Sequence, residues 1–232
     1  MKLSLHKKVL LSMGVVAGIG ALAGAGTFAT FTAQTSNPSN TFANGTLVLS
    51  NTVGAASACL STGGGNTDTN SNGVCDTAFS LAVKAPGDSS TASLTLQNKG
   101  SLPASALKLF SGSCTDANAA GENYHGTGSA CGVVQFYVQQ YSDSGLTTPS
   151  ACLYGGSPDS GVTCDFSDAA KTLTTFVAAY PNLGSGLSAG GLAAAGGADA
   201  TWVKVGVKLP ATAGNSYQGR SASLALNWQI TQ

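Results

Sequence analysis

Apolar and polar residues alternate along much of this chain, which is the pattern of β-strands that bury one face. The alternation is clearest over 132–141, 200–209 and 221–231, where aliphatic and aromatic residues occupy every second position. Shorter runs predict further strands over 30–40, 41–50, 78–84, 91–98 and 102–110. Over 171–180 three threonines favour a strand, with a short helix as the alternative.

Glycine and proline mark the places where these strands end. Residues 85–88 are predicted to join two strands in a hairpin, and residues 209–214 to join the last two strands in a terminal hairpin. Two stretches rich in glycine and serine, 54–76 and 142–170, predict excursions with little regular structure. The low-complexity stretch 182–197 predicts a flexible loop or a short alanine helix.

With about eight or nine strands and no convincing long helix, the chain is predicted to be all-β. The best match is a jelly-roll-like β-sandwich with long disulfide-stapled loops. The staples are six cysteines, an even number that falls into three sequence-local pairs, each enclosing a loop rich in small polar residues. The favoured pairs are Cys59 with Cys75, Cys114 with Cys131, and Cys152 with Cys164.

The beginning of the chain has the composition of an export signal. Three lysines lie within the first eight residues, and the uncharged apolar run 9–23 that follows is too short to span a bilayer comfortably. We therefore predict a secretory signal peptide over 1–29, an extended N-terminal segment over 30–40 and a sandwich domain over 41–232. After cleavage no stable membrane anchor is expected, and the protein is predicted to be secreted.

Charge narrows the choice of partners. The whole chain has 10 basic and 10 acidic residues. Because three lysines leave with the signal, the net charge of the mature chain is 7 − 10 = −3. This argues against nucleic acid and anionic lipid, which need a concentrated basic face. Charged residues are only 9% of the chain, and low charge repulsion lets subunits approach one another. Low use of lysine and glutamate by the source organism is the competing explanation.

Metal binding has one candidate in the sequence. Asp68, Asn70 and Asn72, with Asp76 further on, match the first half of a calcium loop, in which oxygen ligands alternate before a turn glycine. The second half fails because Phe79 stands where a glutamate is needed. A solvated turn is therefore the favoured interpretation, and no other cofactor is expected. A zinc site is disfavoured because the mature chain has a single histidine and no Cys-x-x-Cys pair.

Four short motifs resemble the TasA/camelysin family of exported proteins. They are the signal end Gly-Ala-Gly-Thr-Phe-Ala-Thr-Phe at 24–31, Thr-Phe-Ala-Asn-Gly-Thr-Leu-Val-Leu at 41–49, Ala-Pro-Gly-Asp at 85–88 leading into 94–102, and Tyr-Gln-Gly at 217–219 leading into 226–232. The resemblance implies a jelly-roll fold and cleavage between Ala29 and Thr30 by a dedicated signal peptidase. Residues 111–199 carry no matching motif.

The resemblance also implies a function. In fibres of this family the N-terminal segment acts as a donor strand, a role that falls here on Thr30, Phe31, Thr32, Ala33, Gln34 and Thr35. We therefore expect a secreted structural protein that polymerises with itself into fibres of an extracellular or biofilm matrix, where other matrix components are further partners.

Two other functions compete with this expectation. Camelysin relatives are described as metallopeptidases, so a secreted or cell-surface metalloendopeptidase is the alternative. A zinc peptidase needs about three protein ligands and a general base, whereas Glu122 and His125 are the only glutamate and histidine of the mature chain. Their Glu-x-x-His spacing in a glycine-rich loop is more typical of surface residues, and no catalytic residue is assigned. Carbohydrate binding would need exposed aromatic residues, and Trp202 and Trp228 are expected in the core.

Overall fold

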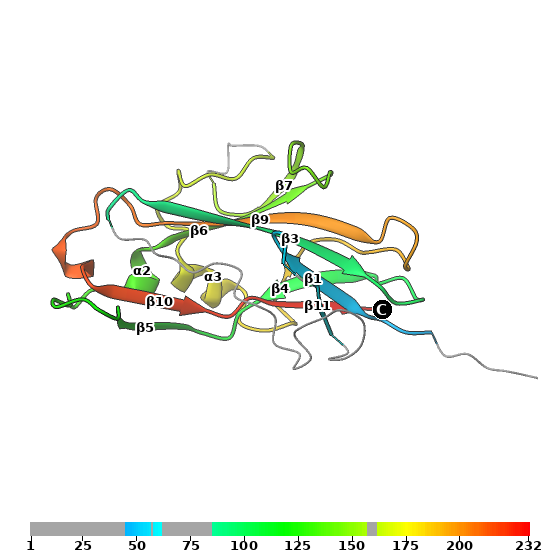
Figure 1. Cartoon of the computed structure of the whole chain (residues 1–232), viewed down its shortest axis with the longest axis horizontal. Coiled ribbons are helices and arrows are strands. Elements are labelled where there is room, and N and C mark those ends of the chain that lie inside the picture. The colour runs from blue at the N-terminus through cyan, green and yellow to red at the C-terminus, as the bar shows by residue number, and fades with distance from the viewer. Residues whose placement is uncertain (1–44, 57, 62–84, 157–161) are drawn as a thin grey trace, which may run out of the picture. The chain divides into compact units, whose positions relative to one another are not determined.

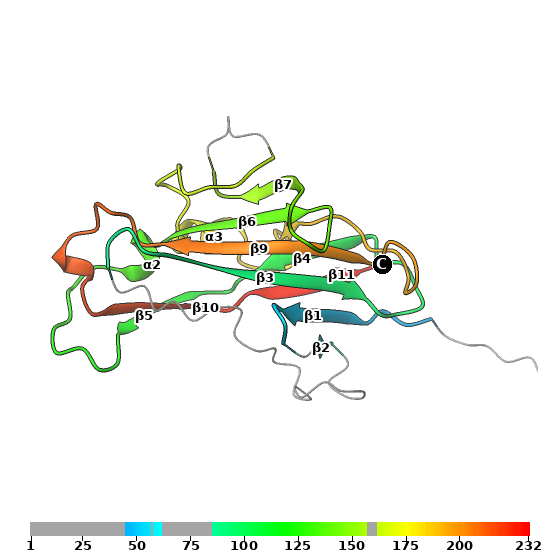
Figure 2. The same ribbon diagram turned by 45° about the horizontal axis from the view of Figure 1, so that its top comes forward.

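Two layers of antiparallel strands build the protein in the computed structural model, which describes residues 45–56, 58–61, 85–156 and 162–232. The first layer is one six-stranded sheet (Figures 1 and 2). Its strands in spatial order are β2 (Cys59–Leu60), β1 (Leu49–Val53), β3 (Ser89–Asn98), β9 (Ala200–Lys208), β6 (Gln135–Tyr141) and β7 (Pro149–Tyr154).

The second layer consists of two short sheets. One has the order β11 (Asn227–Thr231), β4 (Ala106–Phe110), β8 (Leu187–Ser188), and the other pairs β10 (Arg220–Leu224) with β5 (Cys114–Asn118). The two sheets lie end to end, because β10 and β11 are consecutive in one chain segment and pair with β5 and β4, which are consecutive in another. Leu224 pairs with Cys114 and Asn227 with Phe110, so three steps along one segment oppose four along the other. This extra residue is a β-bulge, which separates the two sheets.

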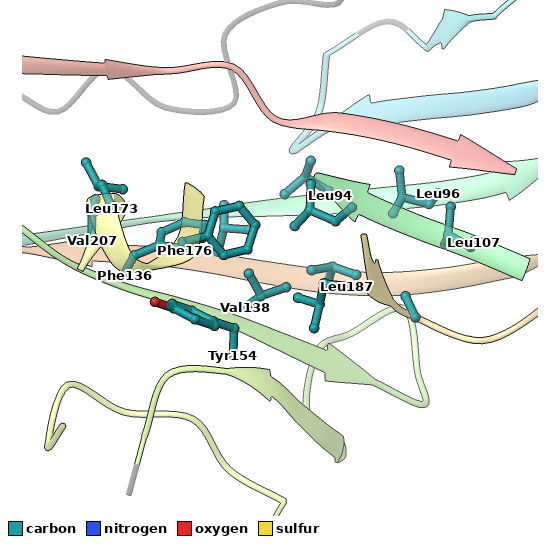
Figure 3. Close-up of a cluster of buried hydrophobic side chains, with 14 of the residues drawn as sticks. Leu94, Leu96, Leu107, Phe136, Val138, Tyr154, Leu173, Phe176, Leu187 and Val207 are labelled. Carbon is teal, nitrogen blue, oxygen red and sulfur yellow. The ribbon is translucent and has the colours of Figure 1, made fainter. Parts of the chain in front are cut away.

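Aliphatic side chains from both layers meet in the core (Figure 3). Leu94, Leu96 and Val205 of the first layer and Leu107 and Leu109 of the second are at most 2% exposed. The described chain also holds the short helices α2 (Ala130–Val133) and α3 (Leu173–Ala179) and the 3-10 turn η1 (Asn215–Tyr217). Within the described part, no helix has the length and apolar character that crossing a membrane requires. All described residues belong to one compact unit, Asn44–Gln232.

The prediction of an all-β fold is confirmed. The jelly-roll connectivity stays a prediction. The predicted apolar faces of 102–110 and 132–141 are also present, since Leu107, Leu109, Phe136 and Val138 are all buried. The strands themselves are shorter than predicted, because β4 begins at Ala106 and β6 at Gln135, after α2.

The strand favoured over 171–180 is wrong, because this segment forms α3. Thr172 caps the helix: its hydroxyl accepts the backbone N–H of Thr175 over 3.3 Å, and the Thr175 hydroxyl accepts the backbone N–H of Thr172 over 2.8 Å. Threonine favours strands, but it also caps helices, and this reciprocal pair is a capping box. Leu173 and Phe176, three residues apart, then face the core together.

The prediction that 200–209 and 221–231 form a terminal hairpin is also wrong. β9 pairs with β3 and β6 in the first layer, whereas β10 and β11 pair with β5 and β4 in the second. Residues 209–214 hold a tight turn, in which the Ala213 N–H donates to Pro210 O over 2.9 Å, but the chain then crosses between layers. Alternation fixes the face of a strand that is buried and leaves its partner undetermined.

The other predicted hairpin is described only in part. Its turn is present, because the Asp88 N–H donates to Ala85 O over 3.0 Å. Residues 91–98 lie in β3, which pairs with β1 and β9, and 78–84 lie outside the described residues. The strand predicted over 41–50 begins only at Leu49 in β1, and 41–44 and 30–40 also lie outside the described part.

Three loop predictions also need correction. The excursion 142–170 contains a regular strand, β7, and the stretch 54–76 contains β2 in its described part. The low-complexity stretch 182–197 is neither a flexible loop nor an alanine helix. It contains β8 and buries Leu187, Ala189 and Leu192, so its few apolar side chains complete the core.

Candidate assembly site

The residues predicted to act in export and assembly precede the described part of the chain. Outside it lie the cleavage pair Ala29 and Thr30, the rest of the donor segment Phe31, Thr32, Ala33, Gln34 and Thr35, and the calcium candidates Asp68, Asn70, Asn72 and Asp76. Cys75 is also outside, so the pair with Cys59 stays a prediction, although Cys59 is disulfide-bonded. The site is therefore built from the surfaces that a donor segment would meet.

The described chain begins at a fixed point beside the connection from β3 to β4. The Thr46 N–H donates to Ser101 Oγ over 3.0 Å, and Thr46 O accepts the Leu102 N–H over 3.1 Å. At Gly100 a Cβ atom would stand 2.1 Å from Thr46 O, so this close approach of two backbones requires glycine. The residues that precede Gly45 are thus attached to the sandwich at this end.

The last strand finishes at the same end. The Ser105 N–H, three residues after Leu102, donates to Thr231 O over 2.8 Å, and Figure 1 shows the C-terminus near the start of the described chain. β11 therefore runs toward the point at which the N-terminal segment is attached. This direction matters for any strand that is added beside it.

One long backbone edge in the second layer has no described partner. β10 pairs only with β5 and β11 only with β4, so their other side is free among the described residues. The inward side chains along it pack against the core but stay half-buried; they are Ala222, Leu224, Leu226, Trp228 and Ile230. The corresponding valines of β9 are fully buried. We call this backbone edge with its row of five side chains the open edge.

β7 is also an outer strand with one described neighbour, β6, but several crosslinks tie it to the segments around it. The disulfide Cys152–Cys164, with Cα atoms 4.9 Å apart, ties the strand to the segment that follows it. The buried Gln139 donates from Nε2 to Ala151 O over 2.9 Å and to Val162 O over 2.8 Å, and its Oε1 accepts the Cys164 N–H. These crosslinks hold β7 in place against β6 and against the segment around Cys164.

The second confirmed disulfide, Cys114–Cys131, joins β5 to α2. Asp116 strengthens this junction, because its carboxylate accepts Ser129 Oγ over 2.7 Å and the Cys131 N–H over 2.9 Å. Burial raises the pKa of Asp116, but these hydrogen bonds and the charge of Arg220 outweigh it. The net pKa therefore lies below the ordinary value of 3.8.

The Glu-x-x-His residues Glu122 and His125 lie in the loop between β5 and α2. His125 Nδ1 is 2.8 Å from Gly219 O, and a carbonyl can only accept, so this nitrogen carries the proton. Among the residues the structure describes, no three histidine, cysteine, aspartate or glutamate side chains gather to hold a metal ion. The described part thus supplies no ligand set for the peptidase alternative.

One of the two tryptophans is not where the sequence placed it. Trp228 does pack against the core, at the open edge. Trp202 is half-buried and lies on the outer face of the six-stranded sheet, because its neighbour in β9, Val203, is on the inner face. Its partner in the β6 register is Tyr141, whose ring lies 5.1 Å from Lys204 Nζ. The alternation does separate the two tryptophans, because Trp202 is out of phase with the buried Val203 and Val205, whereas Trp228 is in phase with Leu226 and Ile230.

The sequence showed the alternation over 221–231. It could not show that these strands lie at an edge, because that depends on which distant strands pair with them. Gln139 was also missed, because nothing in the sequence separates it from Gln135 and Gln140. No protein-family model matches the sequence, and no curated protein matches it significantly.

Proposed function

We propose that this chain is an exported structural protein whose copies polymerise into extracellular fibres. In this proposal Thr30–Thr35 of one copy, freed by signal cleavage after Ala29, adds as a strand to the next copy. The role is structural rather than catalytic, and the main partner is a second copy of the same chain, with other matrix components beside it.

The observation that carries the proposal is the open edge. Unpaired strand edges pair readily with extended segments of another chain, through main-chain hydrogen bonds and alternate side chains. Native proteins usually protect such edges. An edge that has no partner among the described residues along two consecutive strands is therefore suited to a partner strand.

Two further features support self-assembly in an oxidising environment. The disulfides Cys114–Cys131 and Cys152–Cys164 are typical of exported proteins. The mature chain carries few charges and a net charge of only −3, from 7 basic and 10 acidic residues, so copies repel one another weakly. The sequence motifs shared with the TasA/camelysin family point the same way.

Deletion of Thr30–Thr35 tests the proposal. We expect the mature chain to form filaments, seen by electron microscopy, and the truncated chain to stay a folded monomer with its disulfides intact. The matched control is Phe31→Leu, which keeps an apolar anchor and should still polymerise. Filaments of the truncated chain would contradict the proposal.

A further inference from the structure

The outer face of the six-stranded sheet carries two partly exposed aromatic rings. Trp202 lies in β9, between β3 and β6 (Figure 2), and the residue opposite it in β6 is Tyr141. Both side chains keep part of their surface exposed, and no other aromatic ring of the described residues packs against either one. Exposed aromatic rings are the feature that carbohydrate binding requires, and the sequence alone placed Trp202 in the core.

The other end of the same face shows how an outward ring is covered. The Tyr137 ring lies across Gly206, where any Cβ atom would overlap its Cε1 atom, and Phe166 packs on it at a centroid distance of 4.9 Å. Gln135 holds this covering segment, because its Nε2 donates to Phe166 O over 2.9 Å. Tyr137 is therefore only 8% exposed. The chain thus buries the outward ring at one end of β6 and leaves the rings at the other end partly exposed.

Polar groups beside the two exposed rings have no partner in the described part of the chain. Trp202 Nε1, Tyr141 Oη and Lys204 Nζ make no hydrogen bond or ion pair with any described residue, and the indole nitrogen is not buried. Lys204 Nζ lies 5.1 Å from the centroid of the Tyr141 ring, so its charge stands over that ring. Thr95 and Ser93 of β3, opposite the tryptophan and the lysine, add two hydroxyls. Flat rings and free hydrogen-bonding groups therefore lie side by side.

The charge on the six strands is positive only. They contain two charged residues, Lys204 and Lys208, and both lie on the outer face. The mature chain as a whole has 7 basic and 10 acidic residues, so this sheet differs in sign from the rest of the protein. It is therefore complementary to an anionic ligand.

Two acidic residues flank these strands, and both are bonded within the chain. Asp199, just before β9, accepts Gln97 Nε2 over 3.0 Å, and Lys99 adds an opposite charge near it. Asp143, just after β6, accepts the Thr148 N–H over 2.7 Å. These interactions compensate part of the negative charge at this end of the face.

We propose that this face binds an acidic polysaccharide, whose sugar rings carry carboxylates. The apolar C–H face of a sugar stacks on Trp202 and Tyr141, the indole N–H and the phenol bind sugar hydroxyls, and Lys204 pairs with a carboxylate. The site covers three strands, roughly 10 Å across, which is the size of a disaccharide. This inference deepens the proposed function, because it names the chemistry of another matrix component, and it rests on that function for the setting in which the two meet.

Other anionic partners fit this face less well. Nucleic acid and anionic membranes bind through many basic residues at once, and two lysines do not supply such a face. A protein partner would need a larger apolar area than two rings among hydroxyls. A sugar chain presents an apolar ring face, hydroxyls and carboxylates within one repeating unit, which matches the groups that this face offers.

Calorimetric titration of the mature chain with defined oligosaccharides tests the site. The probe is a cellouronate hexamer, the oxidised form of cellohexaose in which every ring carries a carboxylate, and cellohexaose itself is the neutral comparison. We expect the acidic hexamer to bind at least about tenfold more tightly, because only a carboxylate forms a charge-assisted hydrogen bond with Lys204. Added salt should weaken the binding of the acidic hexamer alone.

A pair of tryptophan variants locates the stacking surface. Trp202→Ala should weaken binding of the acidic hexamer at least about tenfold, because it removes the ring that the sugar covers. Trp228→Phe, which changes the tryptophan on the inner side of the second layer, should leave the affinity unchanged.

A pair of lysine variants tests the charge and keeps the site falsifiable if Trp202→Ala fails to fold. Lys204→Gln should lower the affinity for the acidic hexamer to that for cellohexaose. Lys108→Gln removes the same charge from β4 in the second layer and should leave both affinities unchanged.

The outcomes separate this site from the fibre function. No binding of the acidic hexamer, equal affinities of the two tryptophan variants, or equal losses from the two lysine variants would overturn the site. Cellohexaose bound as tightly as the acidic hexamer, or a thymidine hexanucleotide bound more tightly, would overturn the choice of ligand. Electron microscopy of the same mature chain scores filaments. Filaments without sugar binding leave the fibre function standing and this site refuted, and sugar binding without filaments does the reverse.

Discussion

The side of the sandwich at β7 and the side at the open edge use similar residues and reach different degrees of closure. At β7 an aromatic cluster fills the space between β6, β7 and α3, with Phe176 packed against Phe136, Tyr154 and Tyr180 at centroid distances of 4.9, 5.1 and 5.2 Å. At the open edge Trp228 and Ile230 stay half-buried. Among the described residues, the β7 side is thus the more fully packed, and no strand lies beside β10 and β11 on their outer side.

Polar groups differ between the two sides in the same way. The Tyr154 hydroxyl lies 2.8 Å from Thr175 Oγ1 and donates toward Thr172 O, and burial raises the pKa of this phenol. Trp228 Nε1, by contrast, has no partner. In the described part of the chain, the buried polar atoms named here are therefore paired at β7 and unpaired at Trp228.

The largest difference is expected between core truncations on the two sides. Phe176→Ala should lower the free energy of unfolding by about 3–5 kcal/mol, because the side chain is fully buried. Ile230→Ala should cost less, about 1–2 kcal/mol, because part of that side chain is already exposed. Urea unfolding of the two variants at one low protein concentration measures both values, and equal losses would remove the contrast between the sides.

Removing the disulfides should have the next largest effect. The pairs Cys152–Cys164 and Cys114–Cys131 close loops of 12 and 17 residues, so replacing either pair by alanine should cost about 3 kcal/mol in the chain-entropy model. Only the Cys152/Cys164 replacement should also free the β7 edge. Hydrogen exchange at β7 amides should therefore rise in that variant alone, and an equal rise in both would show that the staple does not protect this edge.

The smallest expected effect is the contribution of Asp116 to stability and its loss at acidic pH. Since the pKa of Asp116 is lower in the folded protein than its ordinary value of 3.8, the carboxylate stabilises the fold above that pH and stops doing so as the pH falls through the folded value. Asp116→Asn should cost less than about 1 kcal/mol at pH 7, because solvent screens the group. The difference from wild type should shrink in urea titrations as the pH falls below 3.8 and through the folded pKa; a cost that stays constant with pH would assign the loss to geometry instead of charge.

The sequence was informative where the physical signal is local. Two sequence-local cysteine pairs, the turn 85–88 and the buried faces around Leu107 and Phe136 are confirmed. It failed where the outcome depends on distant partners. The alternation of 200–209 and 221–231 is the same in a hairpin and in strands of two different layers, and the capping role of Thr172 competes with the strand preference of threonine.

The candidate site also has one part with a local sequence signal and one part that depends on distant partners. The donor segment has a local signature at Phe31 and Ala33, although it lies outside the described residues. The open edge has none, because the neighbours of β10 and β11 in the described part of the chain depend on which distant segments pair with them. Trp228 could be recognised as an inward residue from its alternation, but the missing partner of its Nε1 atom appears only when the two layers are assembled.

The position of Gly45 and Thr231 at one end has a practical consequence for imaging. Tyr124, which is 59% exposed, lies in the loop at the other end, where the Ala119 N–H donates to Gly219 O and the Gly126 N–H to Gln218 O. The length of β10 and β11 separates these ends, roughly 35 Å for about eleven residue steps. A dye or epitope inserted beside Tyr124 would therefore report on the protein while leaving the attachment point of the N-terminal segment unobstructed.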